Sequence, residues 1–273
     1  MCNVSSFTPA TFVPATPDRL GRNSARVSTD TFDRQFAVDA RSSAALIAEL
    51  QAALDHIAAD REVRVVVLAA GGRGFCAGHD LKEIRAMGDV PEVEALFAKC
   101  SRMMMSLAAL PQPVIAKVHG IATAAGCQLV AACDLALAAE GTRFATPGVR
   151  IGLFCSTPMV PLSRAVGRKR ALELLLTGEP IDADTACEWG LVNRVVPAEG
   201  LEDAVLDLAA KVARSSPLTL RIGKRAFYEQ IELDERGAYE LTRGVMAANA
   251  QAEDAQEGMS AFLEKRDPTW SGR

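Results

Sequence analysis

The chain has 273 residues, of which 49% are hydrophobic and 23% charged, a composition typical of one large globular domain or of a domain with a helical appendage. Its 30 basic and 34 acidic residues give a formal net charge of −4, with no basic cluster suited to nucleic acid. No apolar run approaches the roughly 20 residues of a membrane span. We therefore expect neither nucleic acid nor a membrane as a partner.

Seven cysteines are scattered along the chain without a CxxC pair. Their odd number and irregular spacing argue against a disulfide framework and against a metal site. The N-terminus lacks a basic start followed by an apolar core, so we expect no secretory signal. These features predict a soluble protein of the cytoplasm that holds no metal.

Residues 1–43 show no convincing period of either helix or strand. Pro9, Pro14 and Pro17 interrupt a stretch rich in Ser, Thr, Asp and Arg, as in loops. We expect this segment to be a loose N-terminal arm.

Hydrophobic periodicity becomes clear from residue 44 onward. Apolar residues at helical spacing predict a helix over 44–59, and the β-branched run over 63–70 is typical of a buried parallel strand. The pattern then predicts a helix from Asp80, a helix over 93–110, a strand over 114–118, a helix over 125–132 and a strand over 134–138. This alternation predicts an α/β fold with parallel strand pairing.

Helical signals dominate beyond Pro158. We expect helices over 168–176, 182–188, 201–214, 217–233 and 238–265. The chain therefore divides into an arm (1–43), an α/β core (44–199) and a helical C-terminal subdomain (200–273).

Two loops of small residues form the strongest candidate site. The loop from Gly74 to Glu83 and the loop from Ala124 to Gln128 each follow an apolar strand and open a helix. Backbone N–H groups at such places are unsatisfied and lie at the positive end of a helix dipole. Two such loops face to face can bind one oxygen that gains negative charge. Gln128 stands where an acid/base carboxylate would be useful.

Other candidate sites are weaker. The glycines after residue 70 are spaced G-G-x-G rather than G-x-G-x-x-G, which argues against a dinucleotide site, and no G-x-S-x-G motif of a serine hydrolase occurs. His119 is interpreted as a structural residue at a strand end, and Met103, Met104 and Met105 as core residues.

Five motifs resemble the enoyl-CoA hydratase/isomerase (crotonase) family, in order, over residues 44–270. They are 75–83 (FCAGHDLKE), 113–120 (PVIAKVHG) with 125–127 (AGC), 174–181 (LLLTGEPI), 190–197 (GLVNRVVP) and 257–266 (EGMSAFLEKR). The chain is identified as a member of this family. The resemblance implies the crotonase (ClpP/crotonase-like) fold, a spiral of ββα units with a helical C-terminal subdomain.

The resemblance also implies a substrate and its contacts. In the family a coenzyme A thioester binds with its carbonyl oxygen between two backbone N–H groups, here those of His79 and Ala125. Matching positions place coenzyme A along Ala77, His79, Asp80, Leu81 and Lys82, and place Phe262 and Lys265 against the nucleotide of a neighbouring subunit. We therefore expect a homotrimer or a dimer of trimers, and no cofactor apart from the coenzyme A of the substrate.

The chain departs from the family pattern at both acid/base glutamates. The positions that match them hold Gln128 and Gly148, and a neutral amide does not act as a base near pH 7. These departures occur together in a narrower group of the family with mitochondrial and bacterial members. Residues 1–43 do not resemble the family's N-terminal segment.

Three functions follow from the resemblance. The first is a nominal enoyl-CoA hydratase that stabilises a thioester enolate. A malonyl-type CoA decarboxylase is the alternative, because loss of CO₂ itself generates the enolate and a histidine follows the same Ala-Gly pair in a methylmalonyl-CoA decarboxylase of the family. The third, motivated by Gln128 and Gly148, is a non-catalytic acyl-CoA-binding protein.

Overall fold

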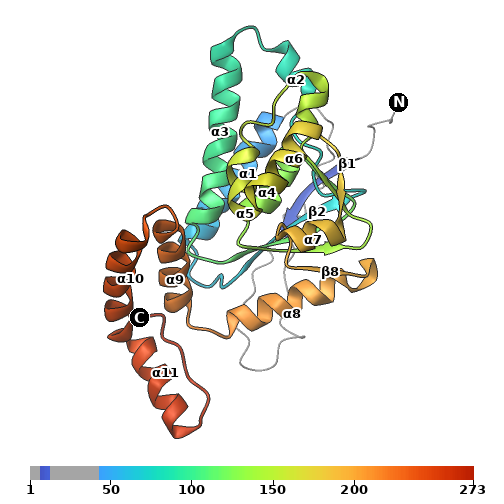
Figure 1. The fold of residues 1–273 in the computed structure, drawn as a ribbon. Coiled ribbons are helices and arrows are strands. Elements are labelled where there is room, and N and C mark those ends of the chain that lie inside the picture. Colours follow the sequence, from blue (N-terminus) through green and yellow to red (C-terminus); the bar gives the residue numbers. More distant parts are fainter. Residues whose placement is uncertain (1–6, 13–42) are drawn as a thin grey trace.

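A five-stranded sheet forms the centre of the computed structural model, which describes residues 7–12 and 43–273 (Figure 1). Its strand order is β1-β2-β3-β5-β8. The strand β1 (Phe7–Phe12) runs antiparallel to β2 (Val66–Gly72). The strands β3 (Val114–Val118), β5 (Leu135–Ala139) and β8 (Arg194–Val196) follow in parallel. The expected α/β fold with parallel pairing is therefore confirmed.

Both faces of this sheet are buried. Val66 and Leu68 belong to the larger core cluster, whereas Val65 and Val67 belong to a second cluster, as the alternation of side chains along a strand requires. The helices α1 (Ser43–Ala59), α3 (Val90–Ala109) and α4 (Ala125–Ala132) contribute to the first cluster, and α8 (Leu201–Ala213) covers the opposite face.

A smaller, three-stranded sheet contributes Ala122 and Phe144 to the larger core cluster. It joins β4 (Ile121–Thr123) in parallel to β6 (Arg143–Ala145), which pairs antiparallel with β7 (Ile181–Asp182). The connecting helices are short: α2 (Leu81–Ala86), η2 (Pro147–Ile151), α5 (Met159–Ala165), α6 (Arg168–Thr177), α7 (Ala183–Trp189) and η3 (Ala198–Gly200).

Three helices extend from the core at the C-terminal end, coloured orange to red in Figure 1. They are α9 (Pro217–Gln230), α10 (Glu235–Ala250) and α11 (Glu253–Glu264). The expectation of one helix over 238–265 is wrong, because Ala252 has an extended backbone with φ −67° and ψ 148° and caps α11. No glycine or proline lies at this break, so the sequence carries no local signal that would end one helix and start another.

A buried ion pair fixes α9 to the core. The Lys224 Nζ lies 2.7 Å from Asp134 Oδ2 and donates to the backbone oxygens of Leu107 and Gln112. The Tyr228 hydroxyl donates to Asp134 Oδ1 at 2.8 Å. Burial lowers the pKa of Lys224, and the neighbouring Asp134 carboxylate opposes that shift.

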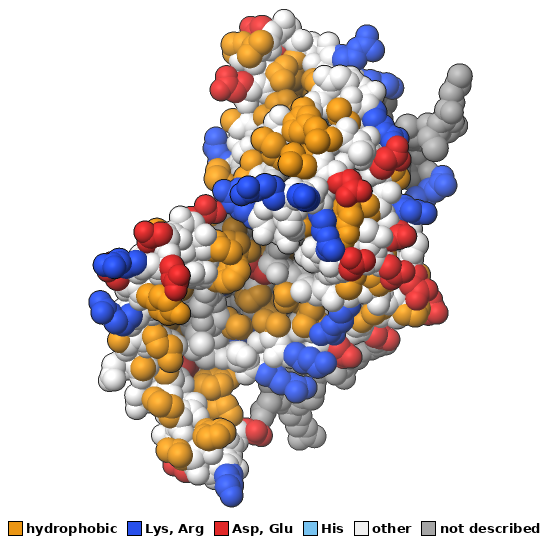
Figure 2. Space-filling model, in the orientation of Figure 1, with side chains coloured by type: hydrophobic (Ala, Val, Ile, Leu, Met, Phe, Trp, Pro, Cys, Tyr) orange, Lys and Arg blue, Asp and Glu red, His pale blue; other side chains and the backbone are white. Residues whose placement is uncertain are grey.

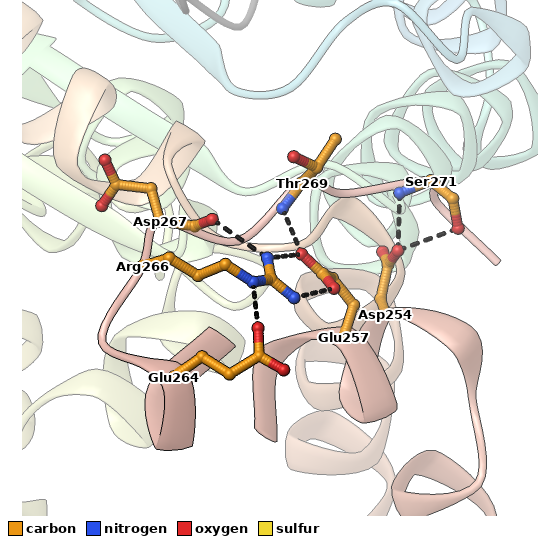
Figure 3. A network of polar contacts seen from close by, with 7 residues as sticks. All are labelled: Asp254, Glu257, Glu264, Arg266, Asp267, Thr269 and Ser271. Carbon is orange, nitrogen blue, oxygen red and sulfur yellow. Dashed lines mark hydrogen bonds and ion pairs between the residues drawn. The ribbon is translucent and has the colours of Figure 1, made fainter. Parts of the chain in front are cut away.

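The segment after α11 turns back along the helix (Figure 3). Arg266 forms two hydrogen bonds with the Glu257 carboxylate, at 2.6 and 2.8 Å, and a third with Glu264. Asp254 is buried and accepts hydrogen bonds from Ser216 Oγ at 2.6 Å and from the Ser271 backbone at 2.6 Å. These contacts connect α11 to the start of α9.

Residues 7–12 correct the expectation that residues 1–43 contain no regular element, because they form β1 and pair with the edge of β2. Elsewhere the expected elements occur with ends shifted by a few residues, the largest shifts being three residues at β2, α3 and α9. None of the helices in 43–273 is long and apolar enough to cross a membrane.

Candidate active site

The two small-residue loops are hydrogen-bonded to each other through β4. The backbone N–H groups of Phe75 and Cys76 both donate to Ile121 O at 3.0 Å, and Thr123 N donates to Cys76 O at 2.9 Å. Cys76 forms an isolated parallel bridge with Ala122. The first loop therefore runs alongside the strand that leads into the second.

Glycine allows these loops to approach closely. Gly78 has φ +96°, and a Cβ built on it would lie 2.9 Å from Ala124 Cβ and 3.5 Å from Ala125 N. A Cβ on Gly126 would lie 2.1 Å from Cys76 O. Since real Cβ atoms do not pack at such distances, both positions require glycine. The backbones of His79 and Ala125 are consequently close neighbours.

The backbone N–H groups of His79 and Ala125 donate no hydrogen bond within the described residues. Their neighbours are engaged: Ala124 N donates to Ala145 O at 2.9 Å, and Gln128 N donates to Ala124 O at 3.0 Å. Ala125 is the first residue of α4, where the helix dipole is positive. Two donors without acceptors, held by a paired backbone, can bind one anionic oxygen.

The His79 side chain packs inside the first loop. Its ring meets the edge of the Phe97 ring, with centroids 5.2 Å apart at 69°, and its Nε2 atom is buried without a hydrogen-bond partner. Burial lowers the pKa of His79, and the charge of Glu83 only partly opposes this shift. The imidazole is therefore neutral at physiological pH.

The remaining residues expected along coenzyme A lie at the surface of this loop. Asp80 caps α2 by accepting a hydrogen bond from Lys82 N at 2.7 Å. Ala77, Leu81 and Lys82 are exposed. The structure therefore brings these four residues together beside His79.

Gln128 lies one turn into α4 and is buried, with 3% of its surface exposed. Its Oε1 atom has no hydrogen-bond partner. An unpaired buried amide oxygen is costly, so Gln128 is an exception among buried polar groups.

Gly148 is buried within η2 under the loop that follows it. A Cβ built on Gly148 would lie 2.3 Å from Leu153 O and 2.9 Å from Cys155 Sγ. Burial raises the pKa of the Cys155 thiol, so this thiol is protonated. The sequence analysis did not anticipate that Leu153 and Cys155 cover this position.

A wide-open surface hollow of about 490 Å³ lies between the end of α2 and the start of α3. It is lined by Met87, Gly88, Asp89, Val90, Val93, Glu94 and Phe97. Phe97 also contacts His79, so the hollow adjoins the two loops.

Phe262 and Lys265 lie on α11 and just after it, at the opposite end of the molecule from α2 (Figure 1). Phe262 is 83% exposed, and hydrophobic side chains lie along the surface of the C-terminal helices (Figure 2). A single chain therefore does not bring Phe262 and Lys265 to the two loops.

Other polar groups have structural roles. His119 Nε2 lies 3.0 Å from Gly72 O. The expectation that the three methionines are core residues is confirmed for Met103 and Met104, which are buried, and is wrong for Met105, which is exposed. The six cysteines between 43 and 273 are free thiols. The same part of the chain contains no group of three His, Cys, Asp or Glu side chains placed to bind a metal ion.

Comparison with known proteins gives a consistent set of matches. The family model described as "Enoyl-CoA hydratase/isomerase" matches residues 23–273. Enoyl-CoA hydratase domain-containing protein 3, mitochondrial, of Xenopus laevis is 47% identical over 83% of this chain and 77% of its own. The 2,3-dehydroadipyl-CoA hydratase of Escherichia coli K12 is 35% identical over 91% of this chain and 96% of its own.

Solved structures agree with this match. An enoyl-CoA hydratase of Mycobacterium smegmatis has a TM-score of 0.81 and 53% identity, over 83% of this chain and 88% of its own. The human enoyl-CoA hydratase domain-containing protein 3 has a TM-score of 0.80 and 46% identity, over 83% and 89%.

These matches correct the expected location. The domain-containing protein 3 relatives of Xenopus laevis, rat and human are each named as mitochondrial. The expectation of a cytoplasmic protein is therefore wrong. It relied on the missing secretory signal and the free cysteines, features that do not separate the cytoplasm from other reducing compartments.

Proposed function

Because this chain belongs to the enoyl-CoA hydratase/isomerase family and has the crotonase fold, we propose that it stabilises the enolate of an acyl-CoA thioester between the backbone N–H groups of His79 and Ala125. The observation that carries this proposal is the close approach of the two loops at Gly78, which leaves two neighbouring donors without acceptors. The thioester carbonyl oxygen is the acceptor they fit.

The chemistry follows from where charge develops. Loss of a proton or of CO₂ next to the thioester carbonyl places negative charge on its oxygen. Donors that are already oriented stabilise that charge by several kcal/mol, on the order of 10²–10³ in rate for one donor. This step requires no metal and no resident cofactor.

Proton transfer is the step for which the site is least equipped. Gln128 carries no acid or base, and Gly148 has no side chain. A general acid or base contributes on the order of 10²–10⁴ in rate, so a hydratase without either glutamate is slow. Among these site residues, His79 has the side chain whose ordinary pKa lies nearest to neutral.

A malonyl-type CoA decarboxylase is the second candidate. The observation that favours it is the sealed position at Gly148, where no carboxylate can stand. Decarboxylation needs the two N–H donors but no base to create the enolate. A non-catalytic acyl-CoA-binding protein uses the same donors and lacks turnover.

Coenzyme A is proposed to lie along Ala77, Asp80, Leu81 and Lys82. Phe262 and Lys265 support an assembly in which a second subunit completes the nucleotide site, a homotrimer or a dimer of trimers, since their own chain holds them far from the loops. Sedimentation equilibrium tests the assembly, and a raised KM for acyl-CoA in Phe262→Ala with unchanged kcat tests the contact.

The central experiment is a panel assay of the full chain with crotonyl-CoA, malonyl-CoA and methylmalonyl-CoA, which separates hydration from decarboxylation. Ala125→Pro removes one donor at the first position of α4; because proline also restricts the preceding residue, and Ala124 has φ 50° and ψ −114°, thermal unfolding of the variant is measured beside its rate. We expect it to lower kcat/KM by about 10²–10³, while Ala125→Gly, which keeps the N–H, stays near the wild type. Equal rates for both variants would overturn the role of Ala125, and tight binding without turnover of any thioester would favour the binding protein.

A further inference from the structure

The last residue of β4, Thr123, contacts the loop from Gly74 to Glu83 twice. Its backbone N–H donates to Cys76 O at 2.9 Å, and its hydroxyl Oγ1 donates to Ala77 O at 3.1 Å. Thr123 is buried, and a β-branched side chain has few rotamers open to it. The hydroxyl is therefore held beside the peptide bond that joins Ala77 to Gly78.

This peptide bond leads into the position of the loop that restrains itself least. Gly78 has φ +96° and must be glycine, because a Cβ there would lie 2.9 Å from Ala124 Cβ. A glycine adopts positive and negative φ about equally well, so residue 78 cannot hold this angle by itself. Because φ of Gly78 sets how the next amide follows from the Ala77–Gly78 peptide, the direction of the His79 N–H depends on contacts that hold that peptide.

Two contacts hold the Ala77–Gly78 peptide, one at each end. The Gly78 N–H interacts with the Cys76 thiol, whose sulfur is a weak acceptor. The Ala77 carbonyl oxygen accepts from the Thr123 hydroxyl, which is an ordinary donor. Cys76 lies in the same loop, whereas Thr123 directly precedes the loop from Ala124 to Gln128. The Thr123 hydroxyl therefore ties the peptide before Gly78 to the backbone that carries the second donor.

We propose that Thr123 is a positioning residue of the candidate site: its hydroxyl fixes the Ala77–Gly78 peptide and so keeps the His79 N–H directed to the same oxygen as the Ala125 N–H. The inference rests on the proposed function, since it requires both N–H groups to bind the thioester oxygen. The hydroxyl is engaged with Ala77 O, so Thr123 acts on the thioester through the loop.

Butyryl-CoA labelled with carbon-13 at its thioester carbonyl is the probe, because a saturated thioester binds without being hydrated or decarboxylated. Infrared difference spectra of its complex with the full chain report hydrogen bonding to the carbonyl oxygen, since donors that polarise a carbonyl lower its stretching frequency. The wild type should give one band, shifted below that of the free thioester. Thr123→Val keeps the branched shape and removes the hydroxyl; it should add a second band, nearer the free frequency, with the Kd unchanged. Thr123→Ser, which keeps a hydroxyl, should return the single band.

Turnover gives a second readout for any thioester of the panel that reacts. Thr123→Val should lower kcat by about three- to tenfold, the effect of one lost hydrogen bond, with KM unchanged, as expected when a contact acts in the transition state. A purely structural role would lower the melting temperature and leave the kcat of the folded variant as it was. Should Thr123→Val not fold, Thr123→Cys replaces it, because a thiol is a weak donor.

Thr142→Val is the matched control. It removes the hydroxyl of another buried threonine, one whose Oγ1 has no hydrogen-bond partner within the described residues, and should keep the single band of the wild type. A folded Thr123→Val with the wild-type band and the wild-type kcat would overturn the inference and leave the proposed function standing. A wild-type complex whose carbonyl frequency equals that of the free thioester would instead overturn the proposed function.

Discussion

The carbonyl oxygen of Leu153 lies where a side chain on residue 148 would begin: a Cβ built on Gly148 comes within 2.3 Å of it. Leu153 N in turn donates to Gly148 O at 2.9 Å, so the two residues hold each other through the backbone. The position that matches a family glutamate is therefore closed as well as empty, and one substitution does not restore a carboxylate there.

Gly148→Ala should destabilise the protein by about 1–3 kcal/mol, because the added methyl group must displace a hydrogen-bonded backbone segment. Gly244→Ala is the matched control, since a Cβ there meets no atom within 4 Å and the site lies inside α10. Alanine at that helical site should stabilise by up to about 1 kcal/mol. Denaturant unfolding measures both, and equal effects of the two variants would contradict the closed position.

His79→Gln should remove a pH dependence of stability. Burial lowers the pKa of His79 below its ordinary value of 6.5, so the unfolded chain takes up this proton more readily than the folded one. The wild type should then lose stability as the pH falls below about 6.5 towards the lower folded pKa, and keep it above that range. Unfolding free energies measured between pH 8 and pH 5 should vary less in the variant; identical slopes would show that the imidazole is not buried.

Glu257→Gln should act in a more acidic range. The hydrogen bonds from Arg266 and from Thr269 N lower the pKa of Glu257 from 4.5 to about 2. Its stabilising contribution is therefore complete above pH 4.5 and is lost as the pH falls towards about 2. The stability difference between wild type and variant should shrink over that interval. Arg266→Gln should reduce the same pH dependence, since it removes the main donor, and an Arg266 variant that keeps it would contradict this assignment.

Lys224→Ala should be far more disruptive than a surface change on the same helix. It leaves the buried Asp134 carboxylate without its cation, a loss of about 3–5 kcal/mol for a buried pair. Arg225 follows Lys224 directly and forms an exposed ion pair with Glu229. Arg225→Ala should have no measurable effect on stability. Thermal unfolding compares the two, and a small loss in Lys224→Ala would show that α9 does not depend on this anchor.

Much of the core was predictable because its signals are local. The apolar positions of α1 recur at helical spacing, and Val65 to Val67 form a β-branched stretch buried on both faces. The strand β1 was missed because Pro9 and its polar neighbours carry no period, and it becomes a strand by pairing with β2. The break at Ala252 was missed because no glycine or proline marks it.

In the candidate site, too, the features with local signals were predictable and those that depend on distant segments were not. The small residues Gly78, Ala125 and Gly126 predict a close approach of the two loop backbones, and the structure shows this approach. The cover over Gly148 depends on how Leu153 folds back, and the surface hollow depends on where α2 stops relative to α3. Neither has a spacing that can be read along the chain.

Ala124 has the positive φ of +50° that residues with a side chain rarely adopt, at a cost of order 1–3 kcal/mol. Its backbone is held on one side by Ala145 O and on the other by the helix that follows. The energetic cost of the Ala124 backbone conformation, which orients the Ala125 N–H, is therefore borne during folding and not during ligand binding. If the proposed function holds, the Ala125 N–H is already oriented before any thioester binds.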